Sequence, residues 1–263
     1  DIQKVDSVDK TKTGYIFTFD KTESMYDDPE HVFFRTNLTP STHSDPGNQW
    51  HNFEVRYPKN DDYDYTIHRE AIKNYVQTFE TALHAGQYDD VFCQYLDVES
   101  ALDYMLINEF TKNVDAYRIS VWMTKDYDKK LAYSTIWDYD LGLANSSRMN
   151  ASDIDRWLYS HEGAKADYYG IPVWYEDLMN SELFQNLLKT RWNQLKNTVF
   201  SVDSINNEID AIRSYLDASG AIERNFEKWK MGDINANVRN VLGDQLNVTN
   251  YDDEITLIKN YVS

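Results

Sequence analysis

The chain has 263 residues, of which 41% are hydrophobic and 14% aromatic, so it can form the core of one large domain or two small ones. Its formal net charge of -18 argues against nucleic acid or an anionic membrane surface as a partner, because both attract Lys and Arg. No window approaches the roughly eighteen apolar residues of a membrane span. Cys93 is the only cysteine, which excludes an internal disulfide and a cysteine-based zinc site.

The first part of the chain predicts two strands followed by a helix. Residues 13–20 and 50–57 are rich in aromatic and β-branched side chains, as is typical of strands. The segment between them contains prolines and a glycine and is predicted to be mostly loop. Apolar residues then recur at helical spacing from Ile67 to Leu83, and Gly86 ends that run.

The middle of the chain predicts a second helix and a β-hairpin. Asp97 is expected to open the helix, which ends near Phe110. Residues 118–124 and 131–138 are predicted strands, joined by the turn sequence DYDKK. Strands that precede and follow helices in this way indicate an α+β protein with antiparallel pairing.

The last part of the chain is predicted to be helical. Residues 146–172 are polar with little periodicity and are expected to form an irregular insertion. From Trp174 onward, leucines and isoleucines recur at helical spacing, and residues 225–230 and 253–262 indicate two more short helices. Trp137, Trp192 and Trp229 are expected to be core anchors.

Three aspartates flank the predicted hairpin. Asp115 precedes it, and Asp138 and Asp140 follow it on either side of Tyr139. If the second strand continued through them, Asp138 and Asp140 would point to the same face. Because a hairpin returns to its starting end, we expect the three carboxylates to converge. Such a cluster is unfavourable without a cation or a shared proton.

This arrangement suits phosphoryl transfer. One carboxylate orients the acceptor hydroxyl and takes its proton, while others hold magnesium ions on the phosphates. By position, Asp115 is predicted to be the hydroxyl-orienting residue, and Asp138, which follows it by 23 residues, the metal ligand. Magnesium prefers few carboxylates together with water and phosphate oxygens, so a small protein ligand set is expected.

The same segment carries two motifs in a fixed order, NE-hydrophobic-T-x-N-x-D and then W-D-x-D with a small-residue stretch. Their residues are Asn108, Glu109, Thr111, Asn113, Asp115, Trp137, Asp138, Asp140, Gly142 and Asn145. In these motifs the sequence resembles the spore coat protein H (CotH) kinase family, an atypical branch with a protein-kinase-like fold. Residues 14–21, 53–58, 174–196 and 224–229 are also similar to elements of that family, so the resemblance spans nearly the whole chain.

The resemblance implies a single kinase-like domain over residues 1–263, with a mainly helical C-terminal lobe, a few antiparallel strands and a catalytic β-hairpin. Strands and loop would occupy residues 1–66, the catalytic core 67–145 and the helical C-terminal region 174–263. The implied reaction is transfer from ATP, with Mg²⁺ or Mn²⁺, to Ser or Thr hydroxyls of a protein substrate such as a surface or coat protein. The implied location is extracellular, on a cell surface or on a spore surface.

Carried over residue by residue, the resemblance makes Asp115 the catalytic aspartate and Asp138 the magnesium ligand, with Asp140 in a metal role. Glu109 and Asn113 are expected to shape the loop that carries Asp115. Asn145 belongs to the small-residue stretch after the metal motif.

Two departures from kinase patterns leave other functions open. Ser120 stands where a kinase catalytic loop has the asparagine that binds a second magnesium ion, and serine is a weaker ligand. Neither a glycine-rich phosphate loop nor a V-A-I-K-type strand precedes Asp115, so the nucleotide-covering region is expected to be missing. Metal binding could survive that loss, whereas efficient phosphate transfer is expected to need the missing region.

One alternative is therefore a non-catalytic surface or structural module that keeps the fold for binding. A weaker alternative is a glycoside hydrolase that uses two of the three carboxylates.

Overall fold

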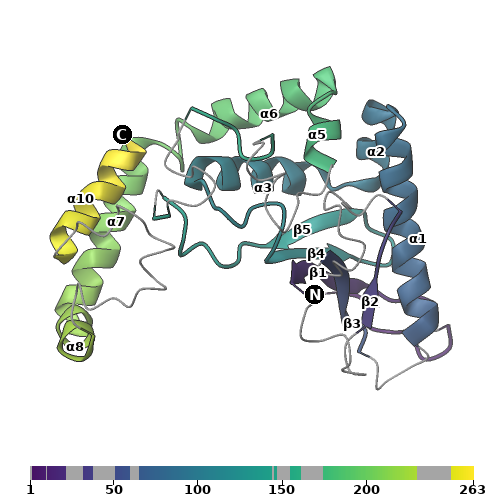
Figure 1. The fold of residues 1–263 in the computed structure, drawn as a ribbon, viewed down its shortest axis with the longest axis horizontal. Helices are drawn as coiled ribbons and strands as arrows, with labels where there is room; N and C mark the ends of the chain where they lie inside the picture. Colours follow the sequence, from purple (N-terminus) through teal and green to yellow (C-terminus); the bar gives the residue numbers. More distant parts are fainter. Residues whose placement is uncertain are drawn as a thin grey trace, which may run out of the picture.

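The computed structural model describes residues 2–9, 11–21, 32–37, 51–59, 65–143, 145–146, 155–160, 174–229 and 250–263. Within these residues the protein is α+β, with eight helices and one five-stranded antiparallel sheet (Figure 1). The strands are β1 (Tyr15–Lys21), β2 (Val32–Phe34), β3 (His51–Tyr57), β4 (Val121–Lys125) and β5 (Leu131–Thr135). The sheet order is β2-β3-β1-β4-β5.

The central strand, β1, pairs with an N-terminal strand on one side and with the hairpin on the other. Phe19 lies opposite Phe53 of β3 and Val121 of β4. Side chains alternate along a strand, so Phe17 and Phe19 share one face, and both are fully buried. The predicted hairpin, β4–β5, is therefore continuous with the N-terminal strands rather than separate from them.

One helix, α1 (Tyr65–His84), covers this sheet near its β2–β3 edge, where it packs against β2 (Figure 1). Helix α2 (Tyr88–Tyr95) packs against α1, and α5 (Trp174–Leu178) packs against both helices. The buried stripe of α1 consists of Ile72, Val76, Phe79 and Leu83, at the spacing that places apolar side chains on one helix face. The Phe79 and Trp174 rings meet edge to face at 5.1 Å, which joins α1 to α5 in the core.

The helix that leads into the hairpin is α3 (Val98–Thr111), which lies between β5 and α6 (Glu182–Leu195). Asp97 caps its N-terminus by accepting a 2.9 Å hydrogen bond from Ser100 N. Lys112 ends the helix in the left-handed region, with φ 51°. On the outer side, Arg191 of α6 makes two 2.7 Å contacts with the Asp103 carboxylate.

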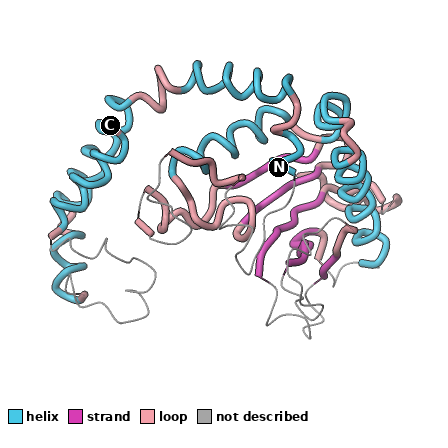
Figure 2. Tube along the Cα trace, turned by 45° about the horizontal axis from the view of Figure 1, so that its top comes forward, coloured by secondary structure: helices cyan, strands magenta, loops and turns pink. Residues whose placement is uncertain are grey.

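The C-terminal helices form an arm on the far side of the molecule: α7 (Val202–Ala218), α8 (Ala221–Lys228) and α10 (Tyr251–Val262). Figure 2 shows that this arm and the sheet with its helices make the two sides of an arch, which α6 spans. No residue of these three helices is buried. Tyr261 Oη donates a 2.7 Å hydrogen bond to Phe110 O, which fastens α10 to α3.

Most predicted elements are confirmed, and several details are corrected. The expectation that residues 21–49 are mostly loop omitted β2, and α2 was not predicted. The strands of the hairpin are shorter than predicted, and most of residues 146–172 lie outside the described parts of the chain. Trp137 and Trp229 are not core anchors, because they are 55% and 64% exposed. None of the described helices is both long and apolar enough to cross a membrane.

Candidate active site

The loop that carries Asp115 follows α3 directly. After Lys112 turns the chain, Asn113 N donates to Asn108 O at 3.3 Å. The Asn113 side chain then accepts a 3.2 Å hydrogen bond from Asp115 N through Oδ1. A side chain that accepts from the backbone two residues ahead forms a local turn, and Asn113 forms one in this loop.

The Asp115 carboxylate is held at one oxygen by a buried arginine. Its side chain is 18% exposed, and Oδ1 lies 3.2 Å from Arg118 Nη2. Arg118 is itself buried and donates through Nε to Val114 O at 2.7 Å. Arg118 was not identified from the sequence, because residue 118 was taken as the start of a strand. The contact with this buried arginine fixes the orientation of the Asp115 carboxylate.

The W-D-x-D loop begins just after β5 ends at Thr135. Asp138 and Asp140 are exposed, and Asp138 has a left-handed backbone with φ 64°. Tyr139 between them is partly buried, and burial raises the pKa of its phenol to about 12. The neutral hydroxyl donates to Asn108 Oδ1 at 2.9 Å. The motif is therefore held on α3 through its tyrosine, with the aspartates on the outside.

Asn108 brings the two aspartate loops together, and its role was not predicted. It is fully buried in the last turn but one of α3, and its Nδ2 donates to Tyr104 O at 2.8 Å. Its Oδ1 accepts from Tyr139 Oη at 2.9 Å and from Asn113 Nδ2 at 3.3 Å. One side-chain oxygen thus connects the Asp115 loop with the loop of Asp138 and Asp140.

Gly142 lets the second loop lie close to the end of α3. A Cβ at this position would be 3.3 Å from Thr111 O and 3.2 Å from Tyr139 O, closer than most Cβ contacts. Next to it, Leu143 N donates to Thr111 O. Asn145 Nδ2 donates to Asp140 O at 2.8 Å, so Asn145 supports the W-D-x-D loop through a backbone contact.

Backbone strain is concentrated in this region. Among the described residues, every non-glycine residue with positive φ lies between residues 112 and 143: Lys112, Tyr117, Ser120, Asp138 and Leu143. Such conformations cost free energy and gather at functional sites when packing holds them. Ser120 Oγ lies 3.5 Å from Asp138 Oδ2, which brings the end of the first loop next to the second.

The expected convergence of three carboxylates is not present. Across the described parts of the chain, no group of three or more His, Cys, Asp or Glu side chains could hold a metal ion. The strand ends before Trp137, and the left-handed turn at Asp138 removes the alternation that would align Asp138 with Asp140. The donor set of two exposed carboxylates and a nearby hydroxyl still fits magnesium, which uses one or two carboxylates together with phosphate oxygens.

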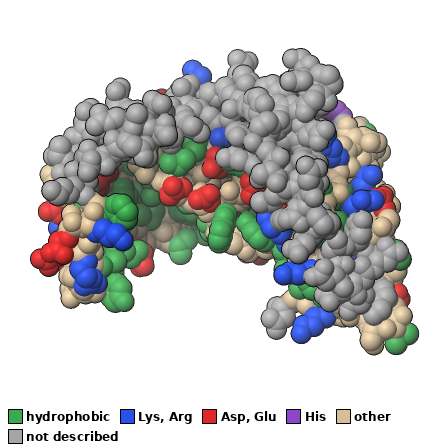
Figure 3. Space-filling view, turned by 60° about the horizontal axis from the view of Figure 1, so that its bottom comes forward, with side chains coloured by type: hydrophobic (Ala, Val, Ile, Leu, Met, Phe, Trp, Pro, Cys, Tyr) green, Lys and Arg blue, Asp and Glu red, His purple; other side chains and the backbone are tan. Residues whose placement is uncertain are grey.

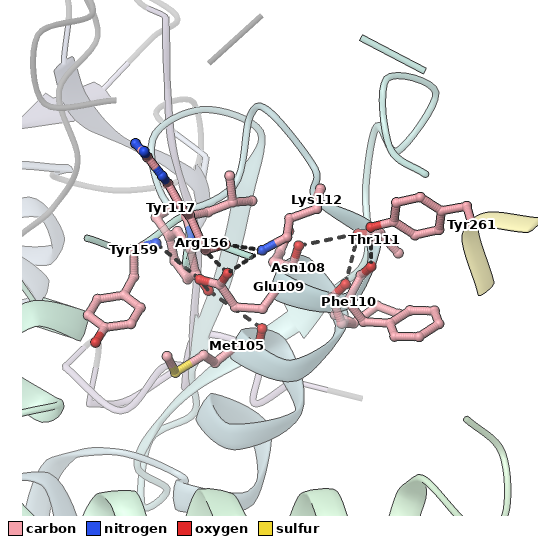
Figure 4. A network of polar contacts seen from close by, with 12 residues as sticks. Met105, Asn108, Glu109, Phe110, Thr111, Lys112, Tyr117, Arg156, Tyr159 and Tyr261 are labelled. Carbon is pink, nitrogen blue, oxygen red and sulfur yellow. Dashed lines mark hydrogen bonds and ion pairs between the residues drawn. The ribbon is translucent and has the colours of Figure 1, made fainter. Parts of the chain in front are cut away.

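Glu109 is a buried carboxylate that accepts from several donors (Figure 4). Burial raises its pKa, against the opposing effects of hydrogen bonds from the amides of Leu158 and Tyr159, the charge of Lys112 and the Tyr117 hydroxyl. The expectation that Glu109 supports the Asp115 loop agrees with its 3.0 Å contact to Tyr117 Oη. The hydrogen bonds that it accepts from the backbone amides of Leu158 and Tyr159 were not predicted from the sequence.

Two cavities flank this site. One of about 420 Å³ lies between the W-D-x-D loop and α10 and includes Asp140, Leu143 and Glu254 in its lining. The other, of about 760 Å³, lies between α3 and α6 and is partly lined by Glu109, Arg156 and Trp192. Figure 3 shows that the molecule is hollowed between the two sides of the arch and that acidic side chains gather inside the hollow.

The fold and site describe an α+β protein in which a helix end holds two aspartate loops around a β-hairpin. The sequence model for the family described as CotH kinase protein matches residues 4–263, and the chain therefore belongs to the CotH kinase family. Membership indicates a kinase-like phosphotransferase at the level of the family. Neither a search of curated proteins nor a search of solved structures gave a match.

Proposed function

We propose that the chain is an ATP- and magnesium-dependent phosphotransferase that acts on protein hydroxyls. Residues 1–263 would form one kinase-like domain, with Asp115 as catalytic residue and Asp138 and Asp140 as metal ligands. The observation that carries the proposal is the link through Asn108, whose oxygen accepts from both aspartate loops. Family membership supports the same reaction class.

In this proposal, Asp115 orients the acceptor hydroxyl and takes its proton as the oxygen attacks the γ-phosphorus. The bond from that phosphorus to the β,γ-bridging oxygen breaks, and ADP leaves. Arg118 fixes the orientation of Asp115 by contacting one of its carboxylate oxygens at 3.2 Å. Bound Mg²⁺ or Mn²⁺ would neutralise charge on the phosphates, and Asp138 and Asp140 would hold it.

The proposed substrates and the proposed location of the protein rest on family membership alone. Because the family is named for a spore coat protein, the proposed substrates are surface or coat proteins, and the proposed location is extracellular or on a cell or spore surface. The -18 net charge favours basic acceptor segments over acidic ones.

A non-catalytic binding module with the same fold is the second candidate. Two observations favour it: Ser120 occupies the position of the second metal ligand, and no metal-binding group of three side chains occurs among the described residues. This candidate predicts that the chain transfers no phosphate under any metal or acceptor condition.

The test is transfer of radiolabelled γ-phosphate from ATP to the chain itself and to a basic acceptor protein. Asp115→Asn should reduce transfer about 100-fold or more, because it removes the group that takes the proton. The matched control is Asp128→Asn, in the exposed turn of the hairpin, which should leave transfer unchanged. Full transfer by Asp115→Asn would contradict the assigned role.

A further inference from the structure

Glu109 connects two segments that are far apart in the sequence (Figure 4). It lies in the last turn of α3 and is 7% exposed. Oε2 accepts from Leu158 N at 2.7 Å, and Oε1 accepts from Tyr159 N at 3.0 Å and from Tyr117 Oη at 3.0 Å. Lys112 Nζ lies 3.6 Å from Oε2.

On one side, this carboxylate holds residues 156–159, which follow the W-D-x-D motif and lack regular secondary structure. Two consecutive backbone amides bind its two oxygens, and Lys112 Nζ donates to Arg156 O in the same segment. Leu158 is buried in the core. Since the contacts use backbone atoms, they fix the path of this segment whatever its other side chains are.

On the other side, the carboxylate holds the loop that carries Asp115. Tyr117, two residues after Asp115, is buried and has a left-handed backbone with φ 68°. Its ring meets Tyr104 edge to face at 5.8 Å and lies 4.8 Å from the Tyr175 ring. Its hydroxyl reaches Glu109, so the strained turn is held at both the ring and the oxygen.

We propose that Glu109 is a positioning residue that couples the Asp115 loop to residues 156–159. The part of this inference that concerns catalysis rests on the phosphotransferase function proposed for Asp115. Through the same contacts, Glu109 fixes Arg156 and Trp157 as one wall of the 760 Å³ cavity, which Glu109 and Lys112 also line.

A carboxylate is needed here because its neighbours are donors. A glutamine has one acceptor oxygen, and its NH₂ group would face an amide N–H or the Lys112 ammonium. Glu109→Gln therefore keeps the size of the side chain and removes one of two acceptor oxygens, each of which accepts from residues 158–159 and one of which also accepts from Tyr117. Glu99→Gln is the matched control, since Glu99 lies on the same helix and is exposed, with its own ion pair to Arg191.

The experiment is amide hydrogen exchange, which requires neither ATP nor metal. Glu109→Gln should speed exchange about 10-fold or more at Leu158 and Tyr159 and also in residues 112–118, while the amides of β4 keep their rates. Glu99→Gln should leave both segments unchanged. Faster exchange in only one of the two segments would overturn the coupling.

Two further measurements keep the proposal open to refutation if Glu109→Gln does not fold. In the wild-type chain, Leu158 and Tyr159 should be protected, and unprotected exchange there would overturn the proposal. Lys112→Met removes the cation beside Glu109 and the donor to Arg156 O, and it should also speed exchange in both segments.

A catalytic readout separates the positioning role from a merely structural one. If wild type transfers phosphate, Glu109→Gln should lower kcat at least about 10-fold with little change in KM for ATP. A rise in KM with kcat unchanged would overturn the positioning role. If wild type transfers no phosphate, the proposed function fails, and the exchange result decides the coupling by itself.

Discussion

At the scale of single residues, the site depends on side chains that do no chemistry themselves. Asn108, buried in α3, accepts hydrogen bonds from Tyr139 and Asn113 and so sets the distance between the two aspartate loops. Arg118 plays a comparable part for Asp115, since it binds both the carboxylate and the backbone of Val114. The aspartates can remain accessible because these buried partners hold the loops.

Asn108→Ala should destabilise the protein by about 2–3 kcal/mol, because it removes the acceptor for two buried or partly buried donors. Urea denaturation at neutral pH measures this change. Asn74→Ala, at an exposed position of α1, is the control and should change the free energy of unfolding by less than about 0.5 kcal/mol. Equal effects of the two substitutions would show that Asn108 does not organise the loops.

At the scale of elements, a buried carboxylate with a strongly raised pKa joins two helices away from the candidate site. Glu80 of α1 accepts a 2.7 Å hydrogen bond from Trp174 Nε1 of α5. Burial raises its pKa from 4.5 to about 7, and hydrogen bonds from Thr36 and Trp174 oppose the shift only in part. Between these two pKa values the folded protein keeps a proton that the unfolded chain has released.

Stability should therefore fall as the pH rises from about 5 to about 8, and the contribution of Glu80 is on the order of 2 kcal/mol. Glu109 contributes in the same direction, since its pKa is also raised. Glu80→Gln should remove much of this slope, whereas Glu70→Gln, at a partly exposed position of the same helix, should retain it. Urea midpoints at pH 5 and pH 8 test this, and an unchanged slope in Glu80→Gln would refute it.

Helices and strands with a long repeating pattern of apolar residues were predicted correctly. Short elements that depend on tertiary contacts were not. The stripe of α1 and the cap at Asp97 gave correct helices, and the hairpin followed from two β-rich runs. The three-residue β2 has too few residues for a pattern, and it is a strand because it pairs with β3. At this scale the α+β class and the order of elements were predictable, and the joining of hairpin and N-terminal strands in one sheet was not.

The candidate site was predictable as a set of motifs and not as a geometry. The spacing of the motifs predicted roles for Asp115 and Asp138, which stay predictions. In the structure, Asn113 accepts from Asp115 N, and Asn145 donates to Asp140 O. Alternation along a strand wrongly aligned Asp138 with Asp140, because nothing in the sequence reveals a left-handed turn at an aspartate. The contact of Arg118 with Asp115 was not predicted for a similar reason, because Arg118 lies in a turn where the sequence pattern predicts a strand.

At the scale of the whole molecule, the two aspartate loops lie where α3, the sheet and the C-terminal arm approach one another. The arm reaches them through α10, which lines the 420 Å³ cavity beside Asp140. Tyr261 fastens this helix to α3 one residue after Glu109. The cavity and the exposed Asp138 and Asp140 are where the proposed function would place the metal-bound nucleotide.

The most direct measurement is calorimetric titration of the chain with ATP in the presence of Mg²⁺ or Mn²⁺, beside Asp138→Ala. Asp128→Ala, which removes an exposed carboxylate from the hairpin turn, is the control for net charge. We expect metal-dependent binding by wild type and by Asp128→Ala, and a loss of at least about 10-fold in affinity for Asp138→Ala. Equal binding by all three chains, or none by wild type, would contradict a metal-nucleotide site at the W-D-x-D loop.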